Sequence, residues 1–475
     1  MRIINVASEA NPFSKTGGLG DVTYSLSKEL TLLGEEVIIF LPLYRHIKEK
    51  FLYQLEEVSS FLVYMSWRRE TCKIYRTKKD DITYYFVDND HYFNRPNFYG
   101  YFDDGERFAY FVMAVKEALL KLDLESDIIH LHDWQTAMLS CLIKEDNSHF
   151  FKDTRVVLTI HNDAFLGMME GNMVSELFNL DPSLYESGKL RFFDKLSTLK
   201  AGIVYADKIV SVSPNRREEL LTKDGGKGLE TIFELRKDDF LGILNGIDYN
   251  EFNPSKDKKI FLDYNEENYF INKSKNKEAL CKKLHIVSSS KPMFALVSRL
   301  TWQKGIDLVL SASEELAKRG CNIVILGSGE YALEQDFETL RSRYPDLVAI
   351  YIGYNDELAH QIYASSDYFM MPSLFEPCGL GQMIAQRYGT LPIVRETGGL
   401  KDSVIGFTGK NKTKANGFTF LDYSKEAMIK ACTSAYDVYW DIPLRKLLMK
   451  NAISVDNSWK KSAKAYQKLY YELVR

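Results

Sequence analysis

Short apolar segments alternate with helix-like segments from the N-terminus onward, and this alternation constrains the fold more than any other feature of the sequence. Ile3–Ala7 is apolar, and the glycine-rich segment 15–21 follows it. Apolar residues then recur at helical spacing up to Leu33, and Glu36–Leu41 is apolar again. Asp21 is a favourable N-cap residue, so we expect the helix to begin there. Strand, loop, helix and strand in this order predict a parallel sheet that is buried on both faces.

The pattern recurs in two series, which predicts an α/β fold with two Rossmann-like, doubly wound domains facing each other across a deep cleft. We expect residues 1–243 to form the first domain and residues 244–455 the second, with residues 456–475 forming a C-terminal helix that packs back toward the first domain. The later strands are expected at Asp127–Leu131, Val156–Ile160, Lys208–Val212, Met293–Val297, Asn322–Leu326, Val348–Ile352, Tyr368–Met371 and Pro392–Val394. Further helices are expected at Arg107–Leu122, Gly305–Ala317, Gly379–Tyr388 and Ser458–Leu473.

Two segments depart from this alternation. Phe51–Asp88 contains aromatic and β-branched runs that predict a β-rich insertion. Asp257–Lys283 is rich in lysine, asparagine and glutamate, so we expect it at the surface.

Composition excludes several classes of protein. The 475 residues carry 61 Lys and Arg against 65 Asp and Glu. The chain therefore lacks the excess of basic residues that is usual in a nucleic-acid-binding protein. The 6 cysteines are scattered without a Cys-x-x-Cys pair, which predicts reduced, mostly buried thiols. No apolar stretch approaches the roughly 18 residues of a membrane helix. We therefore expect a cytoplasmic protein without membrane contact, whose oligomeric state the sequence does not give.

Three loops between a strand and a helix contain candidate ligand-binding residues. The segment Lys15–Asp21 combines glycines, a cation and a helix N-terminus, which suits a phosphate, although a tight turn explains the glycines equally well. Ser298–Gly305 contains two cations that suit a diphosphate, or it is a solvated loop. In Pro372–Leu380, Glu376 either binds sugar hydroxyls or is a surface charge or helix cap. Cys378 in the same loop is more typical of a packed residue than of a nucleophile.

Polar residues at two further strand ends are candidates. His132 and Asp133 end one strand and His161 ends the next, and two histidines in one half of the chain keep a site interpretation open. Asp88-Asn89-Asp90 has the spacing of a metal-binding motif, but an acidic turn is favoured because no other carboxylate cluster supports a metal.

These motifs occur in a fixed order. The set KTGGLGDV, HDW, TIHN, VSP, GILNGID, NK, SRLTWQKG, IGY, MPSLFEPCGL and TGGLKDSV resembles the bacterial glycogen synthase and plant starch synthase family over essentially the whole chain. The resemblance implies the two-domain GT-B glycosyltransferase fold. It also implies transfer of glucose from ADP-glucose to the non-reducing end of an α-1,4-glucan with retention of configuration, and neither a metal nor another cofactor.

The resemblance assigns donor-side roles residue by residue. Lys15 and Gly18 would lie at the donor phosphates, where Asp21 would help to hold the donor, and Arg299 and Lys304 would clamp the diphosphate. Tyr354 would stack on adenine. Within the third loop, Glu376 would bind hydroxyls of the donor glucose beside Cys378 and the N–H groups of Gly379 and Leu380.

On the acceptor side, Asp133 would face the glucan, and Tyr92, Phe93 and Arg95 would form part of its wall. His161 would sit beside the donor glucose near the reacting carbon. The residues implied in catalysis are His161, Arg299, Lys304, Glu376 and Lys15. No carboxylate is clearly placed for a covalent intermediate, so front-face substitution is favoured, with a leaving phosphate oxygen taking the acceptor's proton.

The sequence departs from the family pattern at Leu374, Gly381 and Gln135, where arginine, threonine and histidine are usual, which affects donor affinity and nucleotide preference. Ile384 stands where related transferases have a second glutamate. The alternatives are a UDP-glucose-dependent or small-acceptor glucosyltransferase and a catalytically silent glucan-binding protein. A phosphorylase is disfavoured because no pattern indicates its pyridoxal-phosphate lysine.

Overall fold

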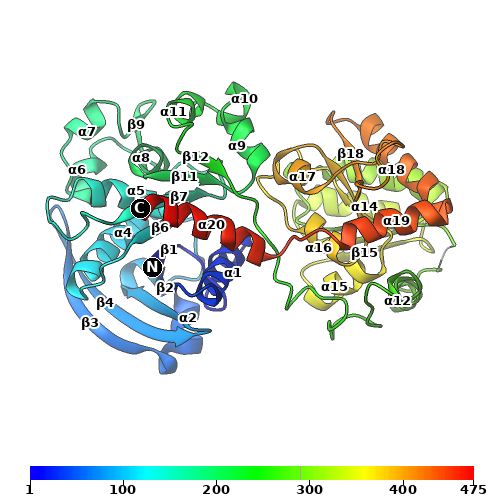
Figure 1. The fold of residues 1–475 in the computed structure, drawn as a ribbon, viewed down its shortest axis with the longest axis horizontal. Coiled ribbons are helices and arrows are strands. Elements are labelled where there is room, and N and C mark those ends of the chain that lie inside the picture. Colours follow the sequence, from blue (N-terminus) through cyan, green and yellow to red (C-terminus); the bar gives the residue numbers. More distant parts are fainter. Residues whose placement is uncertain (289) are drawn as a thin grey trace. The chain divides into compact units, whose positions relative to one another are not determined.

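The computed structural model describes residues 1–288 and 290–475 and divides them into two compact units. One unit comprises Met1–Ile243 together with Trp459–Arg475, and the other comprises Leu244–Ser458. The chain therefore returns to its first unit at the C-terminal helix (Figure 1). None of the helices in the described part of the chain is long and apolar enough to cross a membrane.

The first unit is built on a nine-stranded sheet in the order β12-β11-β7-β6-β1-β2-β5-β4-β3. From β12 to β5 neighbouring strands are parallel, whereas β4 and β3 add to the edge in antiparallel pairing. The β-rich insertion thus extends the main sheet. The strands are β1 (Arg2–Val6), β2 (Glu36–Pro42), β3 (Glu56–Met65), β4 (Arg68–Lys79), β5 (Ile82–Asp88), β6 (Ile128–His132), β7 (Arg155–Ile160), β11 (Lys208–Ser211) and β12 (Phe240–Gly242), with a small sheet of β8 (Met168–Met169), β9 (Arg191–Phe192) and β10 (Lys195–Ser197).

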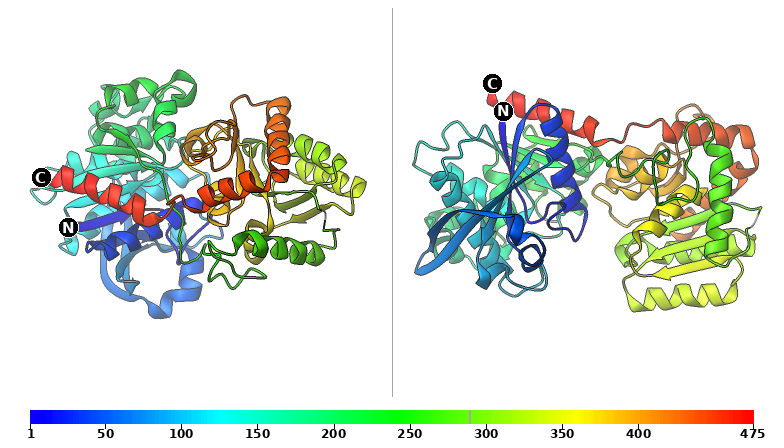
Figure 2. Two further views of the ribbon diagram at one scale, coloured as in Figure 1. Left: turned by 45° about the vertical axis from the view of Figure 1, so that its right-hand side comes forward. Right: turned by 90° about the horizontal axis from the view of Figure 1, so that it is seen from below.

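Helices connect these strands, as apolar residues at helical spacing require. The C-terminal helix packs against the first helix, and the fifth helix packs against both the fourth and the eighth (Figures 1 and 2). They are α1 (Gly18–Leu32), α2 (Arg45–Phe51), α3 (Asp90–Phe93), α4 (Asp104–Lys121), α5 (Trp134–Lys144), α6 (Met173–Phe178), α7 (Ser183–Glu186), α8 (Thr198–Tyr205), α9 (Pro214–Leu220), α10 (Lys223–Gly226), α11 (Glu230–Leu235) and α20 (Trp459–Val474), with the 3₁₀ helix η1 (Leu52–Gln54).

The second unit is built on a six-stranded parallel sheet in the order β15-β14-β13-β16-β17-β18. Its strands are β13 (Met293–Val297), β14 (Asn322–Gly327), β15 (Val348–Ile352), β16 (Tyr368–Met371), β17 (Leu391–Arg395) and β18 (Phe418–Phe420). Its helices are α12 (Tyr269–Lys283), α13 (Ile306–Lys318), α14 (Tyr331–Arg343), α15 (Asp356–Ser365), α16 (Gly381–Arg387), α17 (Gly398–Ser403), α18 (Lys425–Trp440) and α19 (Ile442–Ile453), with the 3₁₀ helix η2 (Trp302–Lys304). The prediction of two α/β units with parallel sheets is confirmed.

Two local predictions are wrong. Helix α1 begins at Gly18 rather than Asp21, because the carboxylate of Asp21 is engaged by Lys15 and Asn11 and does not cap the helix. The segment expected at the surface contains α12, on which Lys273, Asn276 and Lys277 are buried. The aliphatic stems of the lysines pack in the interior while their amines bond to carbonyl and carboxylate oxygens, so a lysine-rich composition does not ensure exposure.

Candidate functional site

The glycine-rich loop of the first unit joins β1 to α1 and is held by its own ion pair. The ammonium of Lys15 lies 2.8 Å from the carboxylate of Asp21. Burial raises the pKa of Asp21, and the hydrogen bond from Lys15 opposes this effect. A Cβ atom added at Gly18 would meet nothing within 4 Å, so the backbone at the start of α1 is open to a ligand. The loop therefore offers a cation and an accessible helix N-terminus side by side.

Sequence reasoning missed Glu9, a buried residue whose carboxylate anchors this loop. Its carboxylate is 3% exposed and accepts hydrogen bonds from both the backbone N–H and the hydroxyl of Thr16. The hydroxyl of Tyr99 donates to the same carboxylate at 2.7 Å. Glu9 therefore ties the glycine-rich loop to the segment that precedes α4. A glutamate in the run that follows β1 was visible in the sequence, but its partners were not.

Asp133 and His161 meet at the ends of β6 and β7. The Asp133 carboxylate accepts hydrogen bonds from the backbone N–H groups of His161 at 2.7 Å and Asn162 at 3.1 Å. Asp133 has φ of 60°, a conformation that non-glycine residues adopt only where the surroundings enforce it. Burial raises the pKa of Asp133 to about 7. In this structure Asp133 shapes the loop that presents His161.

A buried ion pair also holds the loop after β7, which carries His161. The guanidinium of Arg216 on α9 bonds to both carboxylate oxygens of Asp163, at 3.2 and 2.6 Å, and both side chains are 6% exposed. Bidentate arginine–carboxylate pairs fix geometry as well as charge. Sequence reasoning missed this pair, although Arg216 lies only two residues after the VSP motif.

The side chains expected to line the acceptor wall are buried or paired with carboxylates. Tyr92 is 1% exposed, and its hydroxyl donates to Glu106 at 2.8 Å, so its ring offers no free face for a sugar. Phe93 is fully buried as well, so neither ring of this pair presents a face to the acceptor. Arg95 forms a bidentate pair with Asp103, with both distances 2.6 Å. The segment is thus a packed, hydrogen-bonded support.

In the second unit, the loop after β13 meets the loop after β16. The ammonium of Lys304 lies 2.6 Å from the carboxylate of Glu376, which also accepts from the hydroxyl of Ser373 at 3.0 Å. Glu376 is 7% exposed, so it is neither a surface charge nor a helix cap. Arg299 in the first of these loops is exposed. The sequence placed these residues in separate loops, and the structure joins Lys304 with Glu376.

Glycines let these loops approach one another. Gly305 has φ of +69°, and a Cβ there would lie 2.3 Å from the carbonyl oxygen of Pro372. Gly398, in the TGGLKDS segment, has φ of +43°, and a Cβ there would lie 1.9 Å from the carbonyl oxygen of Glu376. Only glycine combines these backbone angles with such contacts. Both glycines therefore position the loop that carries Glu376.

The remaining donor-side candidates lie on or beside this loop. Burial raises the pKa of the Cys378 thiol to about 12, which keeps it protonated and agrees with a packed residue. The backbone at Gly379 turns with φ of +74°, and Leu380 precedes α16. The side-chain amide of Gln382 donates to the carbonyl oxygens of Cys378 and Gly379, at 3.2 and 3.1 Å. Gln382 is a further positioning residue that sequence reasoning missed.

The departures at Leu374 and Gly381 have local consequences. Leu374 is 47% exposed, while its backbone N–H donates to the carbonyl oxygen of Gln303 and its own carbonyl oxygen accepts from the guanidinium of Arg395. The loop backbone is therefore held without an arginine at this position. A Cβ at Gly381 would lie 3.0 Å from the ring of Phe369, so a larger residue there would require repacking. The side-chain oxygen of Gln135 is buried without a hydrogen-bond partner among the described residues.

Tyr354 takes no part in the contacts described above between the loops that follow β13 and β16. It follows β15, and its side chain is 86% exposed. Gly353, with φ of +135°, precedes it. The ring is therefore accessible to a flat ligand.

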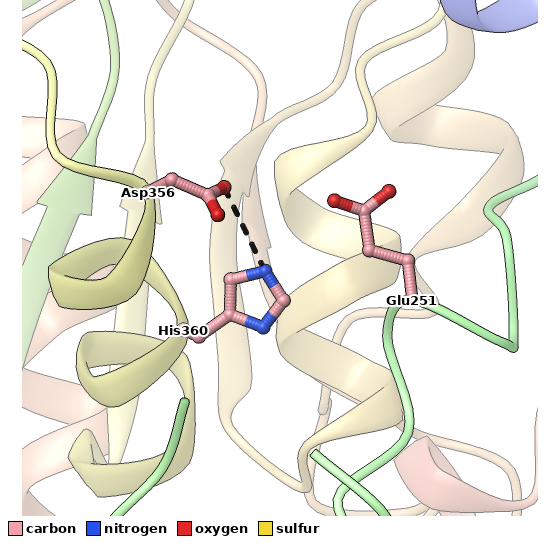
Figure 3. A group of neighbouring side chains, drawn as sticks. All are labelled: Glu251, Asp356 and His360. Carbon is pink, nitrogen blue, oxygen red and sulfur yellow. Dashed lines mark ion pairs between the residues drawn. The ribbon is translucent and has the colours of Figure 1, made fainter. Parts of the chain in front are cut away.

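One group of side chains in the described chain has the donor atoms of a metal site, namely Glu251, Asp356 and His360 (Figure 3). The ammonium of Lys259 lies among them, at 2.5 Å from Asp356, 3.9 Å from Glu251 and 3.3 Å from the imidazole Nε2 of His360. The other imidazole nitrogen lies 2.7 Å from Asp257. Lys259 thus supplies the positive charge that these carboxylates require. Asp88 and Asp90 are likewise paired with a lysine, Lys48, at 2.5 and 2.7 Å.

Comparisons with known proteins cover the whole chain. The family model described as the starch synthase catalytic domain matches residues 2–235, and that of the glycosyl transferases group 1 matches residues 271–454. The chain is 42% identical to a glycogen synthase of Anoxybacillus flavithermus over 477 residues, covering 100% of this chain and 98% of the relative. It is 43% identical to a glycogen synthase of Clostridium perfringens over 478 residues, covering 100% and 99%. The catalytic domain of starch synthase IV from Arabidopsis thaliana, solved with ADP and acarbose, superposes with a TM-score of 0.90 at 33% identity, covering 99% of both chains.

Proposed function

The chain belongs to the family of bacterial glycogen synthases and plant starch synthases, and on this premise we propose that it transfers glucose from ADP-glucose to the non-reducing end of an α-1,4-glucan. The observation that carries this proposal is similarity to glycogen synthases over 100% of the chain at about 40% identity. The fold is the GT-B fold, and the activity is that of a retaining hexosyltransferase.

Fixed positive charge serves this reaction because negative charge grows on the departing ADP. Lys304, Arg299 and Lys15 are the cations we assign to the diphosphate, with the open N-terminus of α1 beside Lys15. Preorganised groups of this kind stabilise the transition state without reorganising during the reaction. The 2.6 Å contact between Lys304 and Glu376 supports the assignment, because the carboxylate holds the ammonium in place before the donor binds.

Glu376 then has two roles. It restrains Lys304, and its carboxylate accepts hydrogen bonds from hydroxyls of the donor glucose. The accessible ring of Tyr354 stacks on adenine, and the N–H groups of Gly379 and Leu380 lie at the donor. Aromatic rings of this kind bind flat bases through their faces.

On the acceptor side we assign Asp133 and Arg95 to shaping the wall rather than to stacking. His161 lies beside the donor glucose. With no carboxylate assigned as a nucleophile, we infer front-face substitution, in which a leaving phosphate oxygen takes the proton of the acceptor 4-hydroxyl. This route accounts for retention without a glycosyl-enzyme intermediate.

The proposed function is tested by incubating the protein with glycogen and either ADP-glucose or UDP-glucose. We expect release of ADP with lengthening of the glucan chains, and a much lower rate with UDP-glucose. A folded protein that binds glycogen but releases no ADP would be a silent glucan-binding protein. Faster turnover of UDP-glucose would overturn the donor assignment.

A variant tests the role of Glu376. Glu376→Gln keeps the shape of the side chain but removes its charge, and we expect the rate to fall by about 10²–10³. Glu338→Gln, at a partly exposed glutamate on α14 of the same unit, is the matched control and should leave the rate unchanged. Equal rates for both variants would contradict a role for Glu376 in transfer.

A further inference from the structure

Three histidines of the first unit lie in contact with one another. His130 and His132 are on β6 and are fully buried, with ring centroids 4.2 Å apart. His161 follows β7, and its Nε2 lies 2.9 Å from Nδ1 of His132. Burial lowers the pKa of His130 and of His161 to about 3, and it lowers the pKa of His132 well below its ordinary value. All three rings are therefore uncharged near neutral pH.

Asn5 determines where the proton of His132 lies. The Asn5 side chain on β1 donates through Nδ2 to the hydroxyl of Ser27 at 3.2 Å. Its carbonyl oxygen therefore faces His132, whose Nε2 lies 3.1 Å away. Because a carbonyl oxygen only accepts, Nε2 of His132 carries the hydrogen, and Nδ1 of the neutral ring is an acceptor.

The contact between the two histidines then has one direction. Nδ1 of His132 accepts, so Nε2 of His161 donates. We propose that His132 and Asn5 are positioning residues that hold the His161 imidazole uncharged with its proton on Nε2, which makes Nδ1 of His161 a hydrogen-bond acceptor. No contact of His132 or Asn5 with a substrate is required.

The consequence for transfer rests on the proposed function. As the glycosidic bond to ADP breaks, positive charge grows on the sugar ring. A protonated imidazole beside the ring would repel that charge, whereas a neutral ring does not. An acceptor at Nδ1 also orients a hydroxyl of the glucosyl group. Asp133 fixes the backbone of His161 and His132 fixes its ring, so the position of the residue and the orientation of the imidazole are both restrained.

The hydrogen bonds of His130, the third histidine of the cluster, offer a control. His130 bonds through Nδ1 to the hydroxyl of Tyr470 on α20 at 2.8 Å and through Nε2 to Thr159 at 2.7 Å. These bonds do not involve a ring nitrogen of His132 or His161. Tyr470→Phe therefore removes one buried hydroxyl from the same cluster without changing the proton on His161.

The first measurement needs no substrate. Nuclear magnetic resonance of the full chain with isotope-labelled histidine nitrogens distinguishes a protonated ring nitrogen from a bare one. The His161 signals are those lost in His161→Asn. We expect a protonated Nε2 and a bare Nδ1 in the wild type and in Tyr470→Phe. A proton on Nδ1, or on both nitrogens at neutral pH, would overturn the proposal.

The second measurement compares kinetics. His132→Leu removes the acceptor, and we expect kcat with ADP-glucose to fall about 10- to 100-fold with a smaller change in KM. His132→Asn restores a carbonyl oxygen near the position of Nδ1 and should recover most of that loss. Tyr470→Phe should keep the wild-type kcat.

The outcomes separate the two hypotheses. A wild-type chain without glucosyl transfer contradicts the proposed function, while the proton on His161 can still be measured. An active wild type whose kcat is unchanged in a folded His132→Leu overturns the positioning role. If His132→Leu does not fold, an equal loss of kcat in His132→Asn and Tyr470→Phe overturns it instead, because a structural defect alone would then account for both.

Discussion

The buried lysine of α12 leads to a quantitative prediction about stability. The amine of Lys273 bonds to the carbonyl oxygens of Tyr363 and Ala364 and to the hydroxyl of Thr390, at 3.2, 3.0 and 2.7 Å. Burial lowers the pKa of Lys273 from its ordinary 10.5 to about 7. At about 1.4 kcal/mol for each unit of pKa, keeping this lysine charged in the folded state costs about 5 kcal/mol.

The sign of the pH dependence follows from proton binding. Below about pH 7 Lys273 is protonated in both states, and the full cost is present. Between about pH 7 and pH 10.5 the unfolded chain holds the proton and the folded chain does not. The contribution of Lys273 to the free energy of unfolding therefore becomes more favourable as pH rises through this range. The change from about pH 7 to about pH 9 is about 2 kcal/mol.

Lys273→Met removes the titrating group but keeps an unbranched chain of similar length. We expect the free energy of unfolding of the variant, relative to the wild type, to fall by about 2 kcal/mol from about pH 7 to about pH 9. Urea unfolding followed by fluorescence at both pH values measures this difference. Lys275→Met, on the exposed side of the same helix, is the matched control and should give a difference that does not change with pH. A flat or rising difference for Lys273→Met would refute the reasoning.

Two other predictions concern the loops at the site. Arg216→Met leaves the buried carboxylate of Asp163 unpaired, so we expect urea unfolding to show a loss of about 3–5 kcal/mol. Adding Asp163→Asn should recover part of this loss, and a double variant no more stable than the single one would contradict the buried-pair account. Gly398→Ala places a Cβ 1.9 Å from the carbonyl oxygen of Glu376 and should displace that loop, which steady-state assays would detect as a higher KM for ADP-glucose and a lower kcat. Gly409→Ala, which also has positive φ but meets nothing within 4 Å, should keep wild-type kinetics, and equal losses in both variants would indicate backbone strain alone.

The order of strands and helices was predictable because it depends on local periodicity. Met293–Val297, Val348–Ile352 and Tyr368–Met371 form strands with the predicted bounds. The C-terminal helix buries Trp459 and Tyr466 on one face, as their spacing predicted. Helical and strand periods are properties of neighbouring residues, so they can be recognised without knowing the tertiary fold.

The sequence alone determined the two α/β series and the loops in which Lys15, His161, Lys304 and Glu376 lie. Only the tertiary structure decided their partners. Lys304 and Glu376 are separated by 72 residues, and Asn5 and His132 by 127, yet each pair is in hydrogen-bond contact. Such contacts exist because parallel strands bring their carboxyl ends to one edge of a sheet, and no local pattern specifies which side chains then meet there. Burial is likewise decided by tertiary packing, because Lys273 lies in the interior although the composition of its segment predicts exposure.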